Sequence, residues 1–149
     1  MNGILKKIKR LNAYLRGFSL EDRPDVAFNY VTGQEDAAPR LVPLAGIQVL
    51  VVRPEARISL LDPDSPRSSV MDVAFFILEK DLGAGKTDQL EQEQYDRTLD
   101  VADAILSRIR DDSEDCDAIA GFSFTDVEVR PEVKVFGSWN GYSLAMSIE

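Results

Sequence analysis

Apolar residues near the N-terminus recur at the 3.6-residue spacing of an amphipathic α-helix. The helix is predicted over Leu5–Arg16 and should end near Gly17, because glycine is a favoured residue just past a helix. Lysine and arginine fill the opposite face. The apolar face is expected either to pack on a sheet or to dock on a partner or an anionic surface. Its residues are Ile4, Leu5, Ile8, Leu11, Leu15 and Phe18.

Three segments in the first half of the chain have the pattern of β-strands. Apolar and polar residues alternate over Val26–Tyr30, which indicates a half-buried strand. Ile47–Val52 is apolar and rich in β-branched residues, as a central strand is, and Val70–Glu79 is the third strand. Pro54 should interrupt the pairing of the second strand, and Ala56–Leu61 could form a short further strand.

Two segments beside these strands are predicted to be loops. Thr32–Pro43 contains a glycine and two prolines, and Asp62–Ser69 contains two prolines and three serines. Residues of these types favour turns and irregular backbone.

A long helix is predicted over Asp88–Arg110. Asp88 followed three residues later by Glu91 is typical of a helix N-terminus. At about 1.5 Å per residue the helix spans the width of a domain of this size, so it should cover one face of the sheet. An acidic connector is expected at Asp111–Asp117. The predicted buried stripe is Tyr95, Leu99, Ala102, Ile105, Leu106 and Ile109.

The pattern of the C-terminal part predicts strands that end in a β-hairpin. Ile119–Phe124 is a possible strand that Val127–Val129 could extend, and Val133–Phe136 alternates well. Residues Tyr142–Ile148 alternate in the last strand. Asn140-Gly141 favours a tight hairpin turn before it.

The order of these elements is α–β–β–β–α–β–β, which predicts the α+β class. We expect one domain over residues 1–149, with a mixed or antiparallel sheet and the long helix packed on it. A chain of 149 residues is long enough to bury a substantial core without disulfides or metals.

The composition argues against an enzyme. The chain has no histidine and a single cysteine, Cys116, so the common general base, the common zinc ligand and every Ser-His or Cys-His system are missing. We therefore expect no catalytic residues, no metal site and no cofactor.

Charge is distributed unevenly along the chain. The net charge is −9, yet the first twenty residues carry five basic residues and no acidic one, so the rest carries a net −14. An acidic surface repels phosphate, so specific nucleic-acid binding is not expected. No apolar run is long enough for a membrane helix, and no membrane association is expected.

Two motifs suggest ligand chemistry without completing its pattern. Gly83-Ala84-Gly85-Lys86-Thr87 resembles the end of a phosphate-binding loop, but Lys80 stands where that loop needs its first glycine. The acids from Asp111 to Asp117 suggest calcium, but Cys116 stands where the calcium loop needs glycine. A flexible loop and a solvated charge run are the simpler interpretations.

Five residues are candidates for contacts with a partner protein. Lys6, Lys7 and Arg10 lie on the basic face of the first helix. Trp139 and Asn140 lie in the expected hairpin, where a tryptophan either packs across strands or anchors a partner.

The element order, size and acidity resemble those of the tail-terminator and tail-completion proteins of tailed bacteriophages. The segments that match are Leu5–Arg16, Ile47–Val52, Val70–Glu79, Asp88–Arg110 and Val133–Ile148. The resemblance implies a non-enzymatic virion subunit, assembled in the host cytoplasm as a ring, usually a hexamer. Such a ring caps the tail tube, joins it to the head-tail connector proteins and lets DNA pass. A related neck or baseplate subunit also fits, since the two loops do not align with the family.

Two other functions stay open from the residues alone. A small intracellular adaptor or regulatory module could act through the basic helix or the Trp139 hairpin. A nucleotide-using enzyme could act through Lys86 and Thr87.

Overall fold

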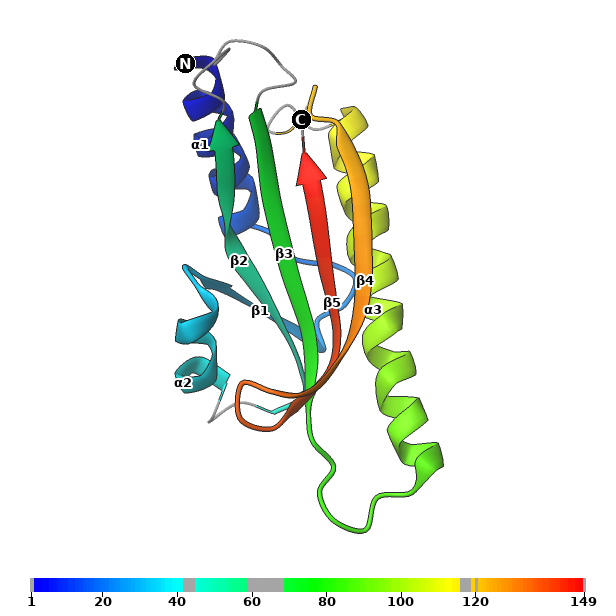
Figure 1. Cartoon of the computed structure of the whole chain (residues 1–149). Helices are drawn as coiled ribbons and strands as arrows, with labels where there is room; N and C mark the ends of the chain where they lie inside the picture. Colours follow the sequence, from blue (N-terminus) through cyan, green and yellow to red (C-terminus); the bar gives the residue numbers. More distant parts are fainter. Residues whose placement is uncertain (1, 42–44, 59–68, 116–118, 120, 149) are drawn as a thin grey trace.

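The computed structural model describes residues 2–41, 45–58, 69–115, 119 and 121–148. A five-stranded sheet and two long helices form most of this part of the chain (Figure 1). The elements in chain order are α1 (Asn2–Arg16), β1 (Val26–Val31), the 3-10 turn η1 (Gln34–Asp36), α2 (Ala37–Leu41), β2 (Ile47–Ile58), β3 (Ser69–Lys80), α3 (Asp88–Asp115), β4 (Phe124–Val135) and β5 (Trp139–Ile148).

The strands form one mixed sheet in the order β1-β2-β3-β5-β4. β1 runs parallel to β2, and every other neighbouring pair is antiparallel. The α+β class, the long helix on the sheet and the C-terminal hairpin are therefore confirmed. β1 and β4 form the two edges of the sheet, because each pairs with only one strand.

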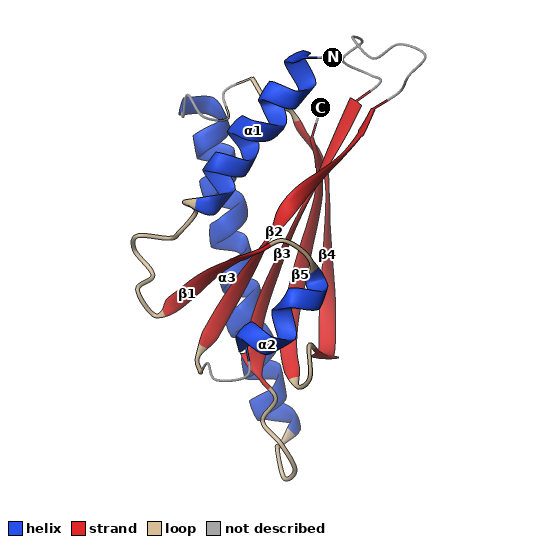
Figure 2. Cartoon of the chain, turned by 90° about the vertical axis from the view of Figure 1, so that its left-hand side faces the viewer, coloured by secondary structure: helices blue, strands red, loops and turns tan. Residues whose placement is uncertain are grey.

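The two long helices cover one face of this sheet. α1 packs on β2, and α3 packs on β5 and β3. Figure 2 shows both helices on one side of the sheet and the short α2 on the other side. The main core lies between the sheet and the two helices, and its most buried large side chains include Leu11, Leu15, Val49, Met71, Phe75, Ile77, Ile105 and Leu144.

A second, smaller core lies under α2 on the opposite sheet face. It contains Trp139, only 3% exposed, from the start of β5. The other buried members are Val31, Ala37, Leu41, Leu50, Phe76 and Leu78. Burial of Ala37 and Leu41 explains why a segment with loop composition becomes helical here.

Several predicted boundaries are wrong. The loop predicted at Thr32–Pro43 contains η1 and α2, because Ala37 and Leu41 bury their side chains on β2 and β3. β2 continues through Pro54 to Ile58 as one strand, although its pairing register shifts between Val52 and Glu55 as Pro54 predicted. The Asp62–Ser69 loop lies outside the described residues except for Ser69, which begins β3.

The long helix is confirmed, but its ends and its buried stripe differ from the prediction. α3 extends to Asp115, so most of the expected acidic connector is helical. Its capping side chain is that of Thr87, whose Oγ1 accepts a hydrogen bond from the Leu90 amide at 3.2 Å. Leu99 is 40% exposed, whereas Thr98 is buried and its hydroxyl is satisfied by the helix carbonyls of Gln94 and Tyr95.

The hairpin is confirmed, but its turn lies earlier than Asn140-Gly141. The turn comprises residues 136–138, and Phe136 and Gly137 take the positive φ angles there. Gly141 serves another purpose inside β5, since a Cβ at this position would clash with the carbonyl of Ile77 in β3. Ile119 is in a turn rather than in a strand, and β4 begins at Phe124.

Replacing Gly141 with alanine should destabilise the fold. Its Cβ would push against β3 backbone, and strain of this kind costs roughly 1–3 kcal/mol or more of unfolding free energy. Gly3→Ala in α1 is the matched control, because no atom lies near that position and alanine favours a helix. Chemical denaturation of both variants measures the difference, and equal midpoints would contradict the close approach of β5 to β3.

Candidate functional site

The edge strand β4 is the most exposed regular element of the sheet. Nine of its twelve residues are exposed, and the other three, Phe124, Glu132 and Val135, are half-buried. Val127, Val129 and Val133 are 41%, 43% and 64% exposed. A long edge strand with exposed apolar side chains is a surface on which another chain can assemble.

An apolar groove of about 370 Å³ runs between β4 and α3. Phe124 and Val127 of β4 form one wall. The α3 wall combines Leu106 and Ile109 with four polar residues, Asp103, Ser107, Arg110 and Ser113. Leu99, exposed one turn earlier than the groove on α3, extends this apolar surface. The groove exists because α3 packs on β5 and β3 and leaves β4 largely uncovered.

Two features of β4 limit open-ended pairing of its backbone. Pro131 has no amide hydrogen to donate, and the register against β5 shifts on both sides of residues 127–132. Lys134, within the second irregular stretch, has a φ of 50°. These features are typical of edge strands that avoid unlimited sheet extension, so side chains should carry a contact made here.

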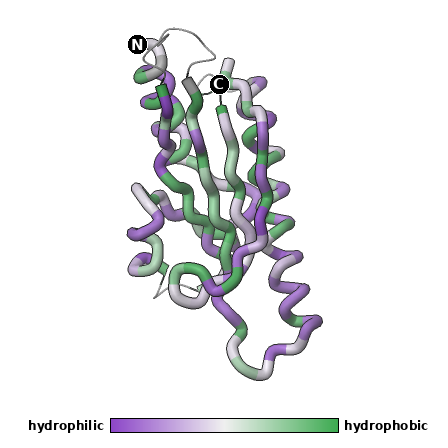
Figure 3. Tube along the Cα trace, viewed as in Figure 1, coloured by the Kyte–Doolittle hydropathy of each residue, from purple (hydrophilic) through white to green (hydrophobic). Residues whose placement is uncertain are grey.

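The charges on α3 are mostly negative. The helix contains ten acidic residues and three arginines. Arg97 is engaged with Glu79 of β3 through two contacts of 3.0 and 2.7 Å, and Arg108 pairs with Asp112 at 2.9 Å. Hydrophilic residues predominate along the N-terminal half of α3 (Figure 3). The exposed acids of α3 therefore dominate the charge of the surface next to β4.

The three basic candidates lie on α1, as predicted. Lys6 and Arg10 are exposed and Lys7 is half-buried. The guanidinium of Arg10 lies 5.1 Å from the centre of the Phe122 ring, so it contributes to packing within the chain. α1 contains no acidic residue, so its basic side chains form no ion pair within the helix.

Trp139 and Asn140 are used inside the fold. Trp139 fills the second core, which matches the packing interpretation of this residue. Asn140 is 1% exposed; its amide donates to Asp81 at 2.7 Å and Gln94 at 3.3 Å, and its oxygen accepts from the Lys134 amide. The structure thus separates the five candidates into an exposed group on α1 and a buried pair on β5.

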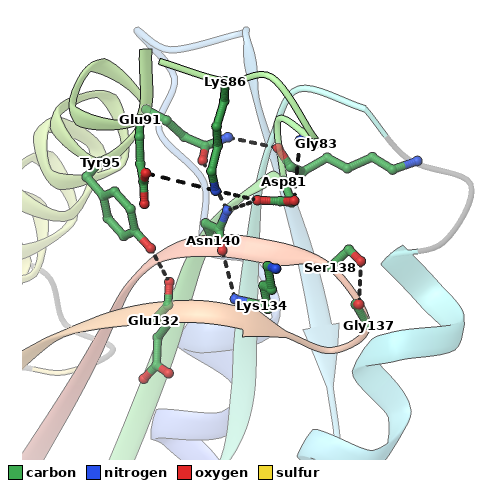
Figure 4. A network of polar contacts seen from close by, with 12 residues as sticks. Asp81, Gly83, Lys86, Glu91, Tyr95, Glu132, Lys134, Gly137, Ser138 and Asn140 are labelled. Carbon is green, nitrogen blue, oxygen red and sulfur yellow. Dashed lines mark hydrogen bonds and ion pairs between the residues drawn. The ribbon is translucent and has the colours of Figure 1, made fainter. Parts of the chain in front are cut away.

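The segment that resembles a phosphate-binding loop belongs to the same polar network (Figure 4). The ammonium of Lys86 donates to Asp81 at 3.1 Å. Gly83 and Gly85, which lie between these two residues in the chain, take positive φ angles. Hydrogen bonds from Asn140 and Lys86 hold the pKa of Asp81 below its ordinary value, and the same contact raises that of Lys86. Lys86 therefore links this loop to the sheet through Asp81 and Asn140, whereas Thr87 caps the start of α3.

The sheet face opposite α1 and α3 also has a groove, of about 560 Å³. Arg53, Glu55, Asp72, Asp126 and Glu128 line it. Its charges are of both signs, and neighbouring arginines pair with two of the acids, Arg57 with Asp72 at 3.6 Å and Arg130 with Glu128 at 2.6 Å. This surface therefore favours neither anionic nor cationic ligands.

Within the described ranges, no three cysteine, aspartate or glutamate residues come together as a metal site. None of the helices in the described part is long and apolar enough to cross a membrane. No protein-family model matches the chain, and no curated protein matches it.

Sequence reasoning missed the groove between β4 and α3. A signal for an apolar face on this strand was present in Val127, Val129 and Val133, whose spacings of two and four residues place them on one face with charged residues between them. Deciding that this face is uncovered required the position of α3, which periodicity does not give.

Trp139→Ala should destabilise the protein because it opens a cavity in the second core. Removing a buried aromatic side chain costs about 3–5 kcal/mol of unfolding free energy. Val133→Ala on the same hairpin is the control, and should change stability by less than about 1 kcal/mol because the side chain is exposed. Thermal or urea unfolding gives both values; similar stabilities for the two variants would contradict the buried indole.

The Asp81 network should produce a pH-dependent stability. The folded-state pKa of Asp81 is depressed, so its contribution is complete above the ordinary pKa near 3.8 and is lost as pH falls through the folded-state value. Wild type should therefore exceed Asp81→Asn in denaturant midpoint at neutral pH, and the difference should shrink below about pH 4. Asp100→Asn on the exposed side of α3 is the control. A difference that persists undiminished in acid would contradict the network.

Proposed function

We propose that the protein is a self-assembling structural subunit that forms a closed ring in the tail or neck of a tailed bacteriophage. Its closest functional model is the tail terminator, which caps the tail tube and joins it to the head connector. The observation that carries the proposal is the exposed apolar edge formed by β4 and the flanking side of α3.

This edge supports assembly because an apolar surface next to an unpaired strand gains stability when another copy covers it. Pro131 and the two register shifts in β4 disfavour continuous sheet growth, which suits a contact of defined geometry. β1 forms the opposite edge of the sheet. A contact between two different edges repeats head to tail, and such contacts close into rings when the rotation allows.

The charge supports passage of DNA through such a ring. Each copy has a net charge of −9, and an acidic ring would not bind phosphates that move through it. The absence of histidine supports a role through contacts rather than through catalysis. The apolar edge and the negative charge fit a related neck or baseplate ring as well as a terminator.

An adaptor or regulatory module is the second candidate. The exposed Lys6 and the acid-free face of α1 favour it, because an acidic partner could dock there. In that case the purified chain should stay monomeric and bind a different protein through α1.

Light scattering on the purified chain tests the proposal. We expect a mass that is a multiple of 16.6 kDa, and closed rings by negative-stain electron microscopy. Val129→Glu should shift the mass toward the monomer, because it places a charge on the apolar edge. Leu82→Glu, equally exposed but in the loop after β3, should leave the mass unchanged.

A monomeric wild type at every concentration would rule out the ring and favour the adaptor. Open filaments in place of closed rings would contradict the terminator role while keeping self-assembly.

A further inference from the structure

We propose that the outer side of α1 in one copy docks on the β4-facing side of α3 in the next copy. This inference rests on the self-assembly proposed above, and it names the surface that covers the apolar edge. The occupant is a second copy of this chain.

The receiving surface is a stripe of alternating charged and apolar side chains on α3. Asp96, Leu99, Asp103 and Leu106 follow one another at spacings of three or four residues, so they lie on one side of the helix. Asp103 and Leu106 line the groove against β4, and Asp96 lines another groove against β5. Both carboxylates are exposed, and Leu99 is 40% exposed.

The docking surface is a matching stripe on α1. Leu5, Lys9 and Arg16 lie on one side of this helix and are exposed. The guanidinium of Arg16 lies 5.9 Å from the centre of the Tyr30 ring, which places this side toward the edge strand β1. Tyr14, on another side of α1, donates to Asp112 at 2.6 Å and thus marks the side toward the chain's own α3.

The spacing of the two stripes agrees. Lys9 and Arg16 are seven residues apart, and so are Asp96 and Asp103, which gives about 10.5 Å in each helix. α1 and α3 run in opposite directions along the sheet (Figure 1). Antiparallel packing of α1 from one copy on α3 of the next can set Lys9 against Asp103 and Arg16 against Asp96. Because Tyr14 contacts Asp112 within one copy, this register requires the next copy to be displaced along the helix axis as well as sideways.

The same repeat brings the apolar residues together. Leu5 precedes Lys9 by four residues on α1, and Leu106 follows Asp103 by three on α3. In antiparallel alignment the two leucines fall at the same level, where the groove of about 370 Å³ is open. Leu5 is 47% exposed and gains apolar burial in that position.

Charge makes this arrangement selective. α1 contains no acidic residue, whereas α3 contains ten acids against three arginines, so two α1 helices or two α3 helices would repel each other. The two helices lie along opposite lateral sides of the sheet (Figure 1), so their contact joins unlike surfaces and repeats head to tail. A head-to-tail contact closes into a ring when the rotation between neighbouring copies allows it.

Charge reversal tests the interface. The variants Lys9→Glu/Arg16→Glu and Asp96→Lys/Asp103→Lys should each raise the concentration at half assembly at least tenfold, measured by light scattering. Mixing the two variants, or combining all four changes in one chain, should restore assembly because opposite charges face each other again. Circular dichroism confirms that each variant is folded.

Arg53→Glu/Arg57→Glu is the matched control, since it makes the same charge change on the opposite sheet face. Its half-assembly concentration should equal that of wild type. Reversals on α1 and α3 that leave an assembled wild type unaffected, or a loss of assembly that no complementary pair restores, would overturn the interface but not the ring. A wild type that never assembles would overturn the proposed function itself.

Discussion

The placement of α3 on β5 and β3 is the constraint on which the other features depend. Its buried side chains, among them Gln94, Thr98 and Val101, face the centre of the sheet and leave little of the helix over β4. The hydroxyl of Tyr95 donates to the carbonyl of Glu132 in β4 at 2.9 Å. One edge of the sheet is consequently exposed on both faces, with an apolar groove beside it.

That placement depends in turn on the register of the central strands. Gly141 lets β5 approach β3 closely, and Asn140 beside it links Asp81 at the end of β3 to Gln94 of α3. Gln94 also donates to the carbonyl of Lys80 at 2.8 Å. Strand register and helix position are thus fixed at the same place, and the loop that resembles a phosphate-binding motif serves this junction.

Much of the fold could be predicted from the sequence, because periodicity directly reports which side chains are buried. The amphipathic α1, the three strands of the first half and the long α3 were found in this way. α2 could not be found, because only tertiary burial of Ala37 and Leu41 makes its short, proline-containing segment helical. The hairpin turn was misplaced because Gly141 has the residue type of a turn but is required for a close contact between strands.

The candidate surfaces were less accessible to sequence reasoning. The basic residues of α1 could be named from charge alone, whereas Trp139 required the structure, since a hairpin tryptophan either packs across strands or contacts a partner. Asp103 is singled out by its position beside the uncovered β4 and Asp96 by its position in the groove against β5, and no local pattern separates them from the other acids of α3.

The central claim is that the β4 side of the molecule is covered by another copy of the chain. Hydrogen–deuterium exchange at concentrations below and above the association midpoint tests it most directly. Slower exchange on association should be concentrated in Phe124–Val135 and in the peptides of α1 and α3 that face the contact. Exchange in β4 that stays the same while the measured mass increases would contradict the account.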